Sequence, residues 1–272
     1  MNWFRFKSLL LFYFRAITRY NVQSPFLYDF VTNVLDITKT YYVFDKIELE
    51  RNKLLCNFEK IEITDFGAGS AQIKSNSRSI SKIVKNSVSK KSKCRLLFNL
   101  VLHYRLKNMI ELGTSLGISS SYLASSDPNC ELVTLEGDPS IIAFANSVHN
   151  NLGIRNIKIF CGRFSDTLPE ALEDINTLDF AFIDGHHLEV PTLEYFELVL
   201  NKCHNNSVVI IDDIYWSKEM NQAWNVLINR PEVTLSIDLF DIGILFFRKE
   251  LSKQNITYIP FQYKPWRIGL FG

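Results

Sequence analysis

Short apolar runs alternate regularly with helix-like segments from Asn108 onward. Five such runs, each of strand length and each followed by a helical pattern, lie at 108–112, 131–136, 156–160, 178–183 and 207–211. Strand–helix units repeated in this way pack as a mostly parallel sheet with helices on both faces. We therefore predict an α/β fold of the doubly wound type.

The two ends of the chain depart from this rhythm. Residues 1–107 read as helical and irregular, which indicates a helical N-terminal extension or cap. The runs 233–240 and 242–248 read as two strands joined by a tight turn at Asp241, so the sheet should contain an antiparallel C-terminal strand. We expect three segments: the extension, a sheet domain over 108–250 and a C-terminal tail over 251–272.

Composition narrows the class of protein without naming a partner. Hydrophobic residues make up 47% of the chain, which allows a sizeable core, and the net charge is only +1. The five cysteines are scattered, odd in number and free of C-x-x-C pairs. This pattern favours free thiols in a reducing cytoplasm over a disulfide framework or a zinc site.

The N-terminal apolar run 8–14 follows Arg5 and Lys7 and superficially resembles a signal peptide. It lacks a small-residue cleavage site and is too short to span a bilayer. We favour a cytoplasmic protein whose aromatic N-terminal helix packs on the main domain. The alternative is a basic, aromatic helix that lies on a membrane surface.

Two glycine-containing loops follow apolar runs, one with Gly67 and Gly69 and the other with Gly113 and Gly117. Only the second is followed by an apolar helix and a strand ending in an acid, Glu136, 19 residues beyond Gly117. A Rossmann-like fold places the carboxylate that binds ribose hydroxyls at this point. We therefore take the second loop as the nucleotide loop and the first as a structural turn.

The second loop also distinguishes between cofactors. It lacks the G-x-G-x-x-G pattern that brings a backbone close to a pyrophosphate, and an acid, Glu111, precedes the turn. S-adenosylmethionine (SAM) has no pyrophosphate but carries an ammonium and a sulfonium, which suit a nearby acid. The loop therefore favours SAM over NAD.

Five stretches together carry a family resemblance, namely 111–119, 133–138, 178–187, 208–213 and 238–248. In order and spacing they resemble the class I SAM-dependent methyltransferases, in particular the small-molecule O-methyltransferase branch with the catechol and caffeoyl-CoA enzymes. The resemblance covers about 108–250 and leaves residues 1–107 unexplained. Each motif is weak alone, and the set is fairly specific.

The resemblance implies a cofactor site and a role for several of its residues. Ser119 would meet the cofactor carboxylate and Glu136 the ribose hydroxyls, while Arg163 and Phe164 are bulkier than the family's usual adenine-pocket residues. The implied cofactor-binding residues are Glu111, Gly113, Thr114, Ser115, Gly117, Ser119, Glu136, Gly137, Gly162, Arg163, Phe164 and Asp184.

Three carboxylates follow neighbouring strands, because Asp184 ends the fourth strand and Asp212 and Asp213 end the fifth. Strand ends in such a sheet converge, so a Mg²⁺ or Ca²⁺ ion would offset their repulsion. Metal-dependent O-methyltransferases carry Asp and then Asp-Asn at these positions, so Asp213 departs from the family pattern. Alternatively, Asp184 binds the SAM ammonium and Asp212 and Asp213 cap the next helix.

His187 follows Asp184 by three residues, where the catechol-type enzymes carry the lysine that deprotonates the substrate. A histidine can do this near neutral pH, so we predict His187 as general base with Asp184 beside it. His186 is the weaker candidate, and a structural loop histidine is the alternative. Tyr215 and Trp216 are candidates for the wall of the acceptor pocket.

The segment between Phe66 and Ile110 holds ten Lys and Arg and no acid. Lys74, Arg78, Lys82 and Lys85 recur at helical spacing, which predicts one basic helix face. A solvated face is the favoured interpretation; an anionic acceptor, RNA and anionic lipid are the alternatives.

The leading functional prediction is methyl transfer to a small hydroxylated acceptor, assisted by a metal in one version. An RNA or anionic-substrate methyltransferase that uses the basic segment 74–107 is the runner-up. A non-catalytic protein that kept the SAM fold is the alternative from another class. The sequence leaves the oligomeric state and the methyl acceptor open.

Overall fold

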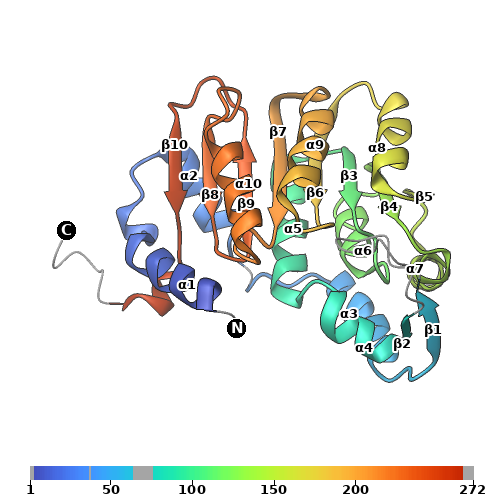
Figure 1. Cartoon of the computed structure of the whole chain (residues 1–272). Coiled ribbons are helices and arrows are strands. Elements are labelled where there is room, and N and C mark those ends of the chain that lie inside the picture. The colour runs from blue at the N-terminus through green and yellow to red at the C-terminus, as the bar shows by residue number, and fades with distance from the viewer. Residues whose placement is uncertain (1–2, 37, 64–75, 266–272) are drawn as a thin grey trace. The chain divides into compact units, whose positions relative to one another are not determined.

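The computed structural model describes residues 3–36, 38–63 and 76–265 (Figure 1). Contacts group the chain into two compact units, one of residues 1–35 with 181–272 and one of residues 36–180. The loop with Gly67 and Gly69, like Lys74, lies outside the described residues. The three segments expected from the sequence stay a prediction. The compact units do not test their boundaries, because one unit combines residues from both ends of the chain.

The described strands form a two-stranded and an eight-stranded sheet, the latter in the order β10-β8-β9-β7-β6-β3-β4-β5. β4 pairs in parallel with β3 and β5, β10 pairs in parallel with β8, and β9 runs antiparallel to β7 and β8. The predicted fold class, a mostly parallel Rossmann-like sheet with an antiparallel C-terminal strand, is therefore confirmed. The strands of this sheet are β3 (Asn108–Leu112), β4 (Glu131–Glu136), β5 (Ile157–Cys161), β6 (Leu178–Ile183), β7 (Cys203–Asp212), β8 (Leu235–Asp238), β9 (Ile242–Phe246) and β10 (Gln254–Thr257).

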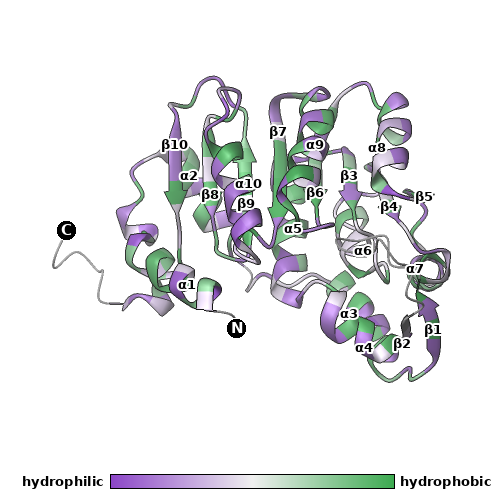
Figure 2. Cartoon of the chain, in the orientation of Figure 1, coloured by the Kyte–Doolittle hydropathy of each residue, from purple (hydrophilic) through white to green (hydrophobic). Residues whose placement is uncertain are grey.

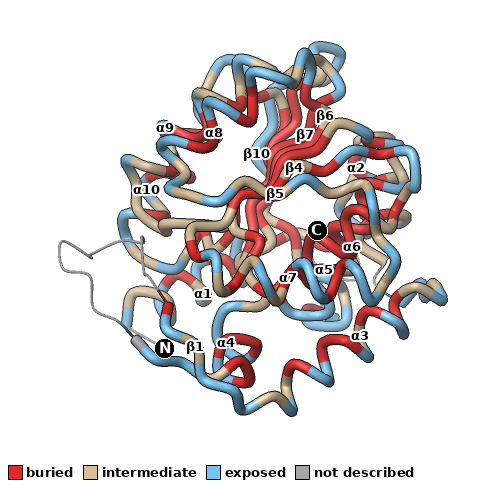
Figure 3. The backbone as a smooth tube through the Cα atoms, turned by 90° about the vertical axis from the view of Figure 1, so that its right-hand side faces the viewer, coloured by how far each residue is buried: buried red, intermediate tan, exposed pale blue. Residues whose placement is uncertain are grey.

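Burial explains why these segments are strands. Almost every residue of β3, β6 and β9 is buried, as expected for strands covered on both faces. Figure 3 shows this burial along β6. β7 begins four residues earlier than the apolar run predicts, at Cys203, and its first residues are polar and only partly buried (Figure 2). Apolar patterning therefore marks the buried part of a strand and misses its exposed end. β10 lies in the segment that the sequence predicted only as a tail.

Helices follow the strands much as the pattern predicts. The carboxylate of Asp138 accepts hydrogen bonds from the N–H groups of Ser140 and Ile141, and Pro139 occupies the first turn of α7, as its sequence indicates. The helices of this part are α6 (Ile118–Ala124), α7 (Pro139–Leu152), α8 (Phe164–Glu173), α9 (Glu189–Leu200) and α10 (Lys218–Ile228).

The N-terminal region is helical, as expected, but it also contains a pair of antiparallel strands that the sequence did not reveal. Its elements are α1 (Trp3–Arg15), α2 (Pro25–Asp29) with a π-helical turn (Phe30–Val34), α3 (Tyr42–Leu55), β1 (Lys60–Ile63), β2 (Asn76–Ser79), α4 (Ile80–Ser87) and α5 (Lys91–Tyr104). Arg78 lies in β2 opposite Ile61, so the prediction of one basic helix face is wrong for Arg78. Lys82 and Lys85 do lie exposed on α4. Charge spacing alone could not show that backbone pairing with β1 takes residues 76–79 out of the helix.

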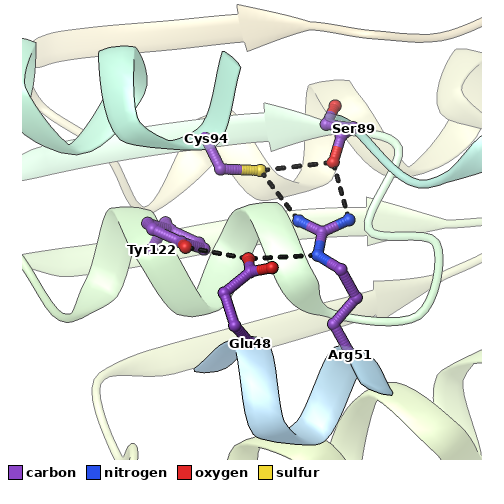
Figure 4. Close-up of polar contacts among 5 residues, drawn as sticks. All are labelled: Glu48, Arg51, Ser89, Cys94 and Tyr122. Carbon is purple, nitrogen blue, oxygen red and sulfur yellow. Dashed lines mark hydrogen bonds and ion pairs between the residues drawn. The ribbon is translucent and has the colours of Figure 1, made fainter. Parts of the chain in front are cut away.

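Helices α3 and α5 share a core with α6 inside the unit of residues 36–180. Phe44 of α3 packs against Phe98 of α5 and Tyr122 of α6, with ring centroids 4.8 and 5.0 Å apart. Beside these rings lies the polar network of Figure 4, in which Glu48 accepts hydrogen bonds from Arg51 at 3.1 Å and from the Tyr122 hydroxyl at 2.9 Å. The same guanidinium donates to the main-chain carbonyl of Ser89 at 2.9 Å, and it contacts the Cys94 thiol. Because the partly buried ions are paired, the network fastens these helices without leaving a buried charge.

Candidate cofactor site and candidate catalytic residues

The loop after β3 has an unusual backbone. Gly113, Ser115 and Gly117 all have positive φ, at 104°, 47° and 79°. The N–H groups of Gly113 and Thr114 both donate to the carbonyl of Leu135, at 2.9 and 3.1 Å, which ties the loop to the end of β4. Positive φ at alternate residues turns the chain sharply at the carboxyl end of β3, where nucleotide-binding loops lie in sheets of this type.

Glu111 is the most deeply buried acid of this region, with no exposed surface. One carboxylate oxygen, Oε2, accepts a hydrogen bond from the Thr134 hydroxyl at 2.7 Å, and the Thr114 hydroxyl lies 2.7 Å from that of Thr134. The other oxygen, Oε1, is buried without a hydrogen-bond partner. Burial raises the pKa of Glu111 to about 7, and the nearby hydroxyls of Thr134 and Ser119 partly oppose the rise. A buried carboxylate oxygen without a donor needs a ligand donor to satisfy it.

Glu136 ends β4 and is bonded directly to the glycine loop. Its Oε2 accepts the N–H of Ser115 at 2.9 Å, while Oε1 accepts those of Gly137 at 2.8 Å and Asp138 at 3.2 Å. Burial raises the pKa of Glu136, and these N–H bonds oppose the rise. The Ser115 hydroxyl is buried without a hydrogen-bond partner. The structure therefore brings together Glu111, the loop and Glu136, which the sequence connected only by spacing.

The turn after β5 completes this edge of the unit. Gly162 has a φ of 149° and donates its N–H to the Glu136 carbonyl at 3.0 Å. A side chain at position 162 would come within 2.9 Å of a Thr167 methyl group. Arg163 precedes α8 and is exposed, whereas Phe164 begins that helix and is half-buried. Gly162 thus lies next to Glu136, and its role in an adenine pocket stays a prediction.

The candidate catalytic residues belong to the other compact unit, that of residues 1–35 and 181–272. The His187 Nε2 lies 3.9 Å from an Asp184 carboxylate oxygen, and the His187 ring lies 6.2 Å from that of Trp216. His186 instead places its Nδ1 2.6 Å from the Tyr195 hydroxyl. Both histidines have positive φ, at 63° for His186 and 40° for His187, a backbone that is strained for non-glycine residues. His186 is therefore held by α9, and His187 is the histidine beside Asp184.

The two further acids have distinct surroundings. Asp212 is buried at the end of β7 opposite Ile242, and Asp213 has a φ of 51° and donates its N–H to the Asp241 carbonyl at 2.7 Å. Neither caps the next helix, because the Ser217 side chain does so by accepting the Met220 N–H; that alternative is wrong. Over residues 3–36, 38–63 and 76–265, no three His, Cys, Asp or Glu side chains gather as a metal ion would require.

Comparison with known proteins adds an independent observation. Residues 110–214 match the family model described as "Methyltransferase domain", a span that runs from β3 through the glycine loop, Glu136 and Asp184 to the end of β7. The chain carries a methyltransferase domain. No curated protein sequence matches the chain. Within the described part of this methyltransferase, no helix is long and apolar enough to cross a membrane.

Solved structures share the fold of this methyltransferase. A methyltransferase from Podospora anserina, PaMTH1, with S-adenosylhomocysteine bound, has a TM-score of 0.61 at 13% identity, over 84% of this chain and 98% of that one. The O-methyltransferase TomG from Streptomyces achromogenes, in complex with SAM, has a TM-score of 0.56 at 18% identity, over 77% and 91%. An O-methyltransferase from Bacillus cereus scores 0.55 at 17% identity, over 80% and 96%. At these identities the likeness is one of fold.

Two residues of the methyltransferase loop region escaped the sequence reasoning. Thr134 lies opposite Glu111 in the β3–β4 register, and its only signal was a hydroxyl among the apolar residues in the middle of β4. The His149 Nε2, on α7, lies 2.8 Å from the Ser120 hydroxyl and 3.2 Å from the Gly117 carbonyl. Burial lowers the pKa of His149 to about 4, so the ring is neutral at pH 7. No sequence motif indicated His149, because its ring contacts the loop and the start of α6 from a distant helix, α7.

Proposed function

We propose that this methyltransferase binds SAM at the loop after β3 and transfers its methyl group to a hydroxyl oxygen of a small acceptor. One observation carries the proposal, namely the buried Glu111 carboxylate whose Oε1 has no hydrogen-bond partner. An ammonium group both donates hydrogen bonds and offsets the charge of such a carboxylate. The structurally similar PaMTH1, with S-adenosylhomocysteine bound, and TomG, in complex with SAM, support the same cofactor.

The residues present fit SAM better than a dinucleotide. Glu111 would hold the ammonium, and the Glu136 carboxylate, which can accept more bonds than the three N–H groups give it, would hold the ribose hydroxyls. Gly113, Thr114, Ser115, Gly117, Ser119 and Gly137 would line the amino-acid end of the cofactor, and Gly162, Arg163 and Phe164 its adenine end. When bound, SAM supplies an electrophilic methyl group.

His187 is the proposed general base. An imidazole can accept the acceptor hydroxyl's proton near neutral pH, and Asp184, 3.9 Å away, would stabilise the imidazolium that forms. Asp184 is therefore both a proposed positioning residue for His187 and part of the predicted cofactor set. Positioning of the acceptor oxygen supplies much of the rate in a displacement of this kind.

A metal-assisted version through Asp184, Asp212 and Asp213 stays a prediction. Among the described residues these three carboxylates do not form a ligand cluster, so the residues do not fit a preformed site and we derive no step through a metal. Treatment with EDTA distinguishes the two versions: turnover that survives removal of divalent ions would exclude the metal-assisted one, and lost turnover that Mg²⁺ restores would support it. Two alternatives also stay predictions: a methyltransferase that acts on RNA or another anionic substrate, and a non-catalytic protein that kept the SAM fold. No contact among the described residues favours either of them.

Thermal unfolding with added ligands tests the cofactor. S-adenosylhomocysteine should raise the Tm of the wild type, because a ligand that binds only the native state stabilises it. Glu136→Ala should reduce that shift, whereas Glu131→Ala, which alters an exposed acid at the other end of β4, should not. A shift with NAD and none with S-adenosylhomocysteine would refute the proposal.

A further inference from the structure

Helix α1 presents an apolar stripe to solvent. Spacings of three and four residues place its members along one side of the helix. The stripe consists of Trp3, Phe6, Leu10, Leu11 and Phe14, all exposed. Trp3 is 77% exposed and Phe14 70% exposed, and the helix is mostly apolar in the hydropathy colouring of Figure 2. A helix packed on a domain normally exposes polar residues to water. An exposed apolar stripe of this kind therefore indicates a surface that binds a partner.

Basic residues flank the stripe, and no acid accompanies them. Lys7 and Arg15 lie exposed on α1, Arg19 follows in the next turn, and the sequence of α1 contains neither Asp nor Glu. Lys7 adjoins the stripe on the exposed side, and Arg15 is exposed at its edge. An exposed apolar face with a positive rim and an aromatic residue at each end is the pattern of helices that lie in the interface of anionic lipid bilayers.

The opposite side of α1 is fastened to its own compact unit, so the stripe is held outward. The ammonium of the buried Lys264 donates to the main-chain carbonyls of Tyr13, Phe14 and Ala16 at the end of the helix. Phe12 packs edge-on against Phe240, with ring centroids 5.3 Å apart. Near the start of the helix, Arg5 pairs with Asp241 at 2.8 Å. Membrane contact therefore requires no unfolding or rotation of the helix.

We propose that the stripe of α1 docks this methyltransferase onto membrane surfaces that carry anionic phospholipids. A second copy of the chain fits the face less well. Pairing two stripes would bring two sets of Lys7 and Arg15 together with no acid of α1 to offset them. Anionic head groups supply that offset, while the acyl region takes up Trp3 and Phe14. The inference does not depend on the proposed methyl transfer.

Vesicle flotation tests the proposal without any methyl donor. The wild type should float with phosphatidylcholine vesicles that contain phosphatidylglycerol and should stay behind with phosphatidylcholine alone. Trp3→Ser/Phe14→Ser should lower the binding constant at least about tenfold, because two large apolar side chains no longer insert. The matched control is Tyr42→Ser/Phe58→Ser, which removes two equally exposed aromatics, 77% and 75%, from another part of the chain and should float like the wild type.

Further experiments change the charge beside the stripe and measure the oligomeric state of the protein. Lys7→Glu should weaken flotation, and added salt should weaken the wild type in the same direction. All variants should keep the wild-type Tm, since the changed side chains are exposed. Three results would overturn the proposal: no flotation of the wild type at low salt, equal flotation of Trp3→Ser/Phe14→Ser, or a wild-type dimer that this variant converts to a monomer with no lipid bound by either.

Discussion

The Thr134 hydroxyl donates a hydrogen bond to the Glu111 carboxylate at 2.7 Å, from one strand to its neighbour in the sheet. The bond occupies Oε2 and leaves Oε1 without a partner, in a place where burial has already raised the pKa of the acid to about 7. A single threonine thus orients the group that we propose binds the SAM ammonium. The same hydroxyl lies 2.7 Å from that of Thr114, so it also links the acid to the loop.

Thr134→Val should weaken S-adenosylhomocysteine binding without unfolding the protein. The change keeps the shape of the side chain but removes a hydrogen bond to a carboxylate, so we expect about 1 to 2 kcal/mol, or roughly tenfold in Kd. Thr134→Ser keeps the hydroxyl and should bind nearly as the wild type does. Isothermal titration measures both constants, and equal affinity for Thr134→Val and the wild type would show that Thr134 does not orient Glu111.

Gly117→Ala should destabilise the fold more than an ordinary glycine substitution. At φ 79° a side chain is strained, and its Cβ would lie 2.8 Å from the His149 Nε2 and 3.0 Å from the Ala145 Cα. Strain and overpacking together should cost about 2 to 4 kcal/mol. Gly153→Ala is the matched control, because its φ of 72° is similar and nothing lies within 4 Å.

Urea unfolding distinguishes the two glycines. Gly153→Ala should lose only about 1 kcal/mol from backbone strain. If both variants lose the same amount, the close approach of α6 and α7 at Gly117 is not what requires the glycine.

His149 should make the protein less stable in acid. Its pKa is about 4 when folded and about 6.5 when unfolded, so below pH 6.5 the unfolded state binds more protons. The contribution of the neutral ring is therefore complete above pH 6.5 and is lost as the pH falls toward 4, by up to about 3 kcal/mol. Glu111 and Asp238, whose pKa values burial raises to about 7 and about 6, act in the opposite direction, so the test must be a difference.

The test compares the free energy of unfolding of the wild type with that of His149→Gln, measured in urea from pH 7.5 to 4.5. The wild type should lose more stability than the variant over this range. Parallel pH profiles would mean that His149 titrates alike in both states.

His187→Gln should lower the turnover of an identified hydroxyl acceptor about a hundredfold, because general base catalysis contributes on that order. His186→Gln, the matched control, removes a ring that is held by the Tyr195 hydroxyl and should affect stability more than rate. Equal rates for both variants and the wild type would remove His187 from the chemistry.

The sequence revealed those parts of the fold that repeat or carry a local signal. Alternation placed β3 and α6, and Asp138 with Pro139 placed the start of α7. It missed β1 and β2, because a four-residue strand is too short for a clear apolar period and β2 is entirely polar, and it began β7 too late, where the strand is polar. The Glu111–Thr134 pair was hidden because strand register is a long-range property.

For the candidate site, spacing singled out both Glu136 and the glycine loop, and the structure joins them through the Ser115 N–H bond. It could not show that His186 is bonded to Tyr195 whereas His187 lies beside Asp184, since this depends on two successive residues with positive φ. The roles of the predicted site residues stay predictions.

Titration calorimetry with S-adenosylhomocysteine at pH 6 and pH 8 tests the central claim most directly. If the ionised Glu111 binds the ligand ammonium, affinity should rise several-fold between these values, with release of a proton, because the pKa of the free protein's acid is about 7. Glu111→Gln should bind at least about tenfold more weakly and without this pH dependence. Binding by Glu111→Gln as tight as that of the wild type at pH 8, or no binding by the wild type, would contradict the account.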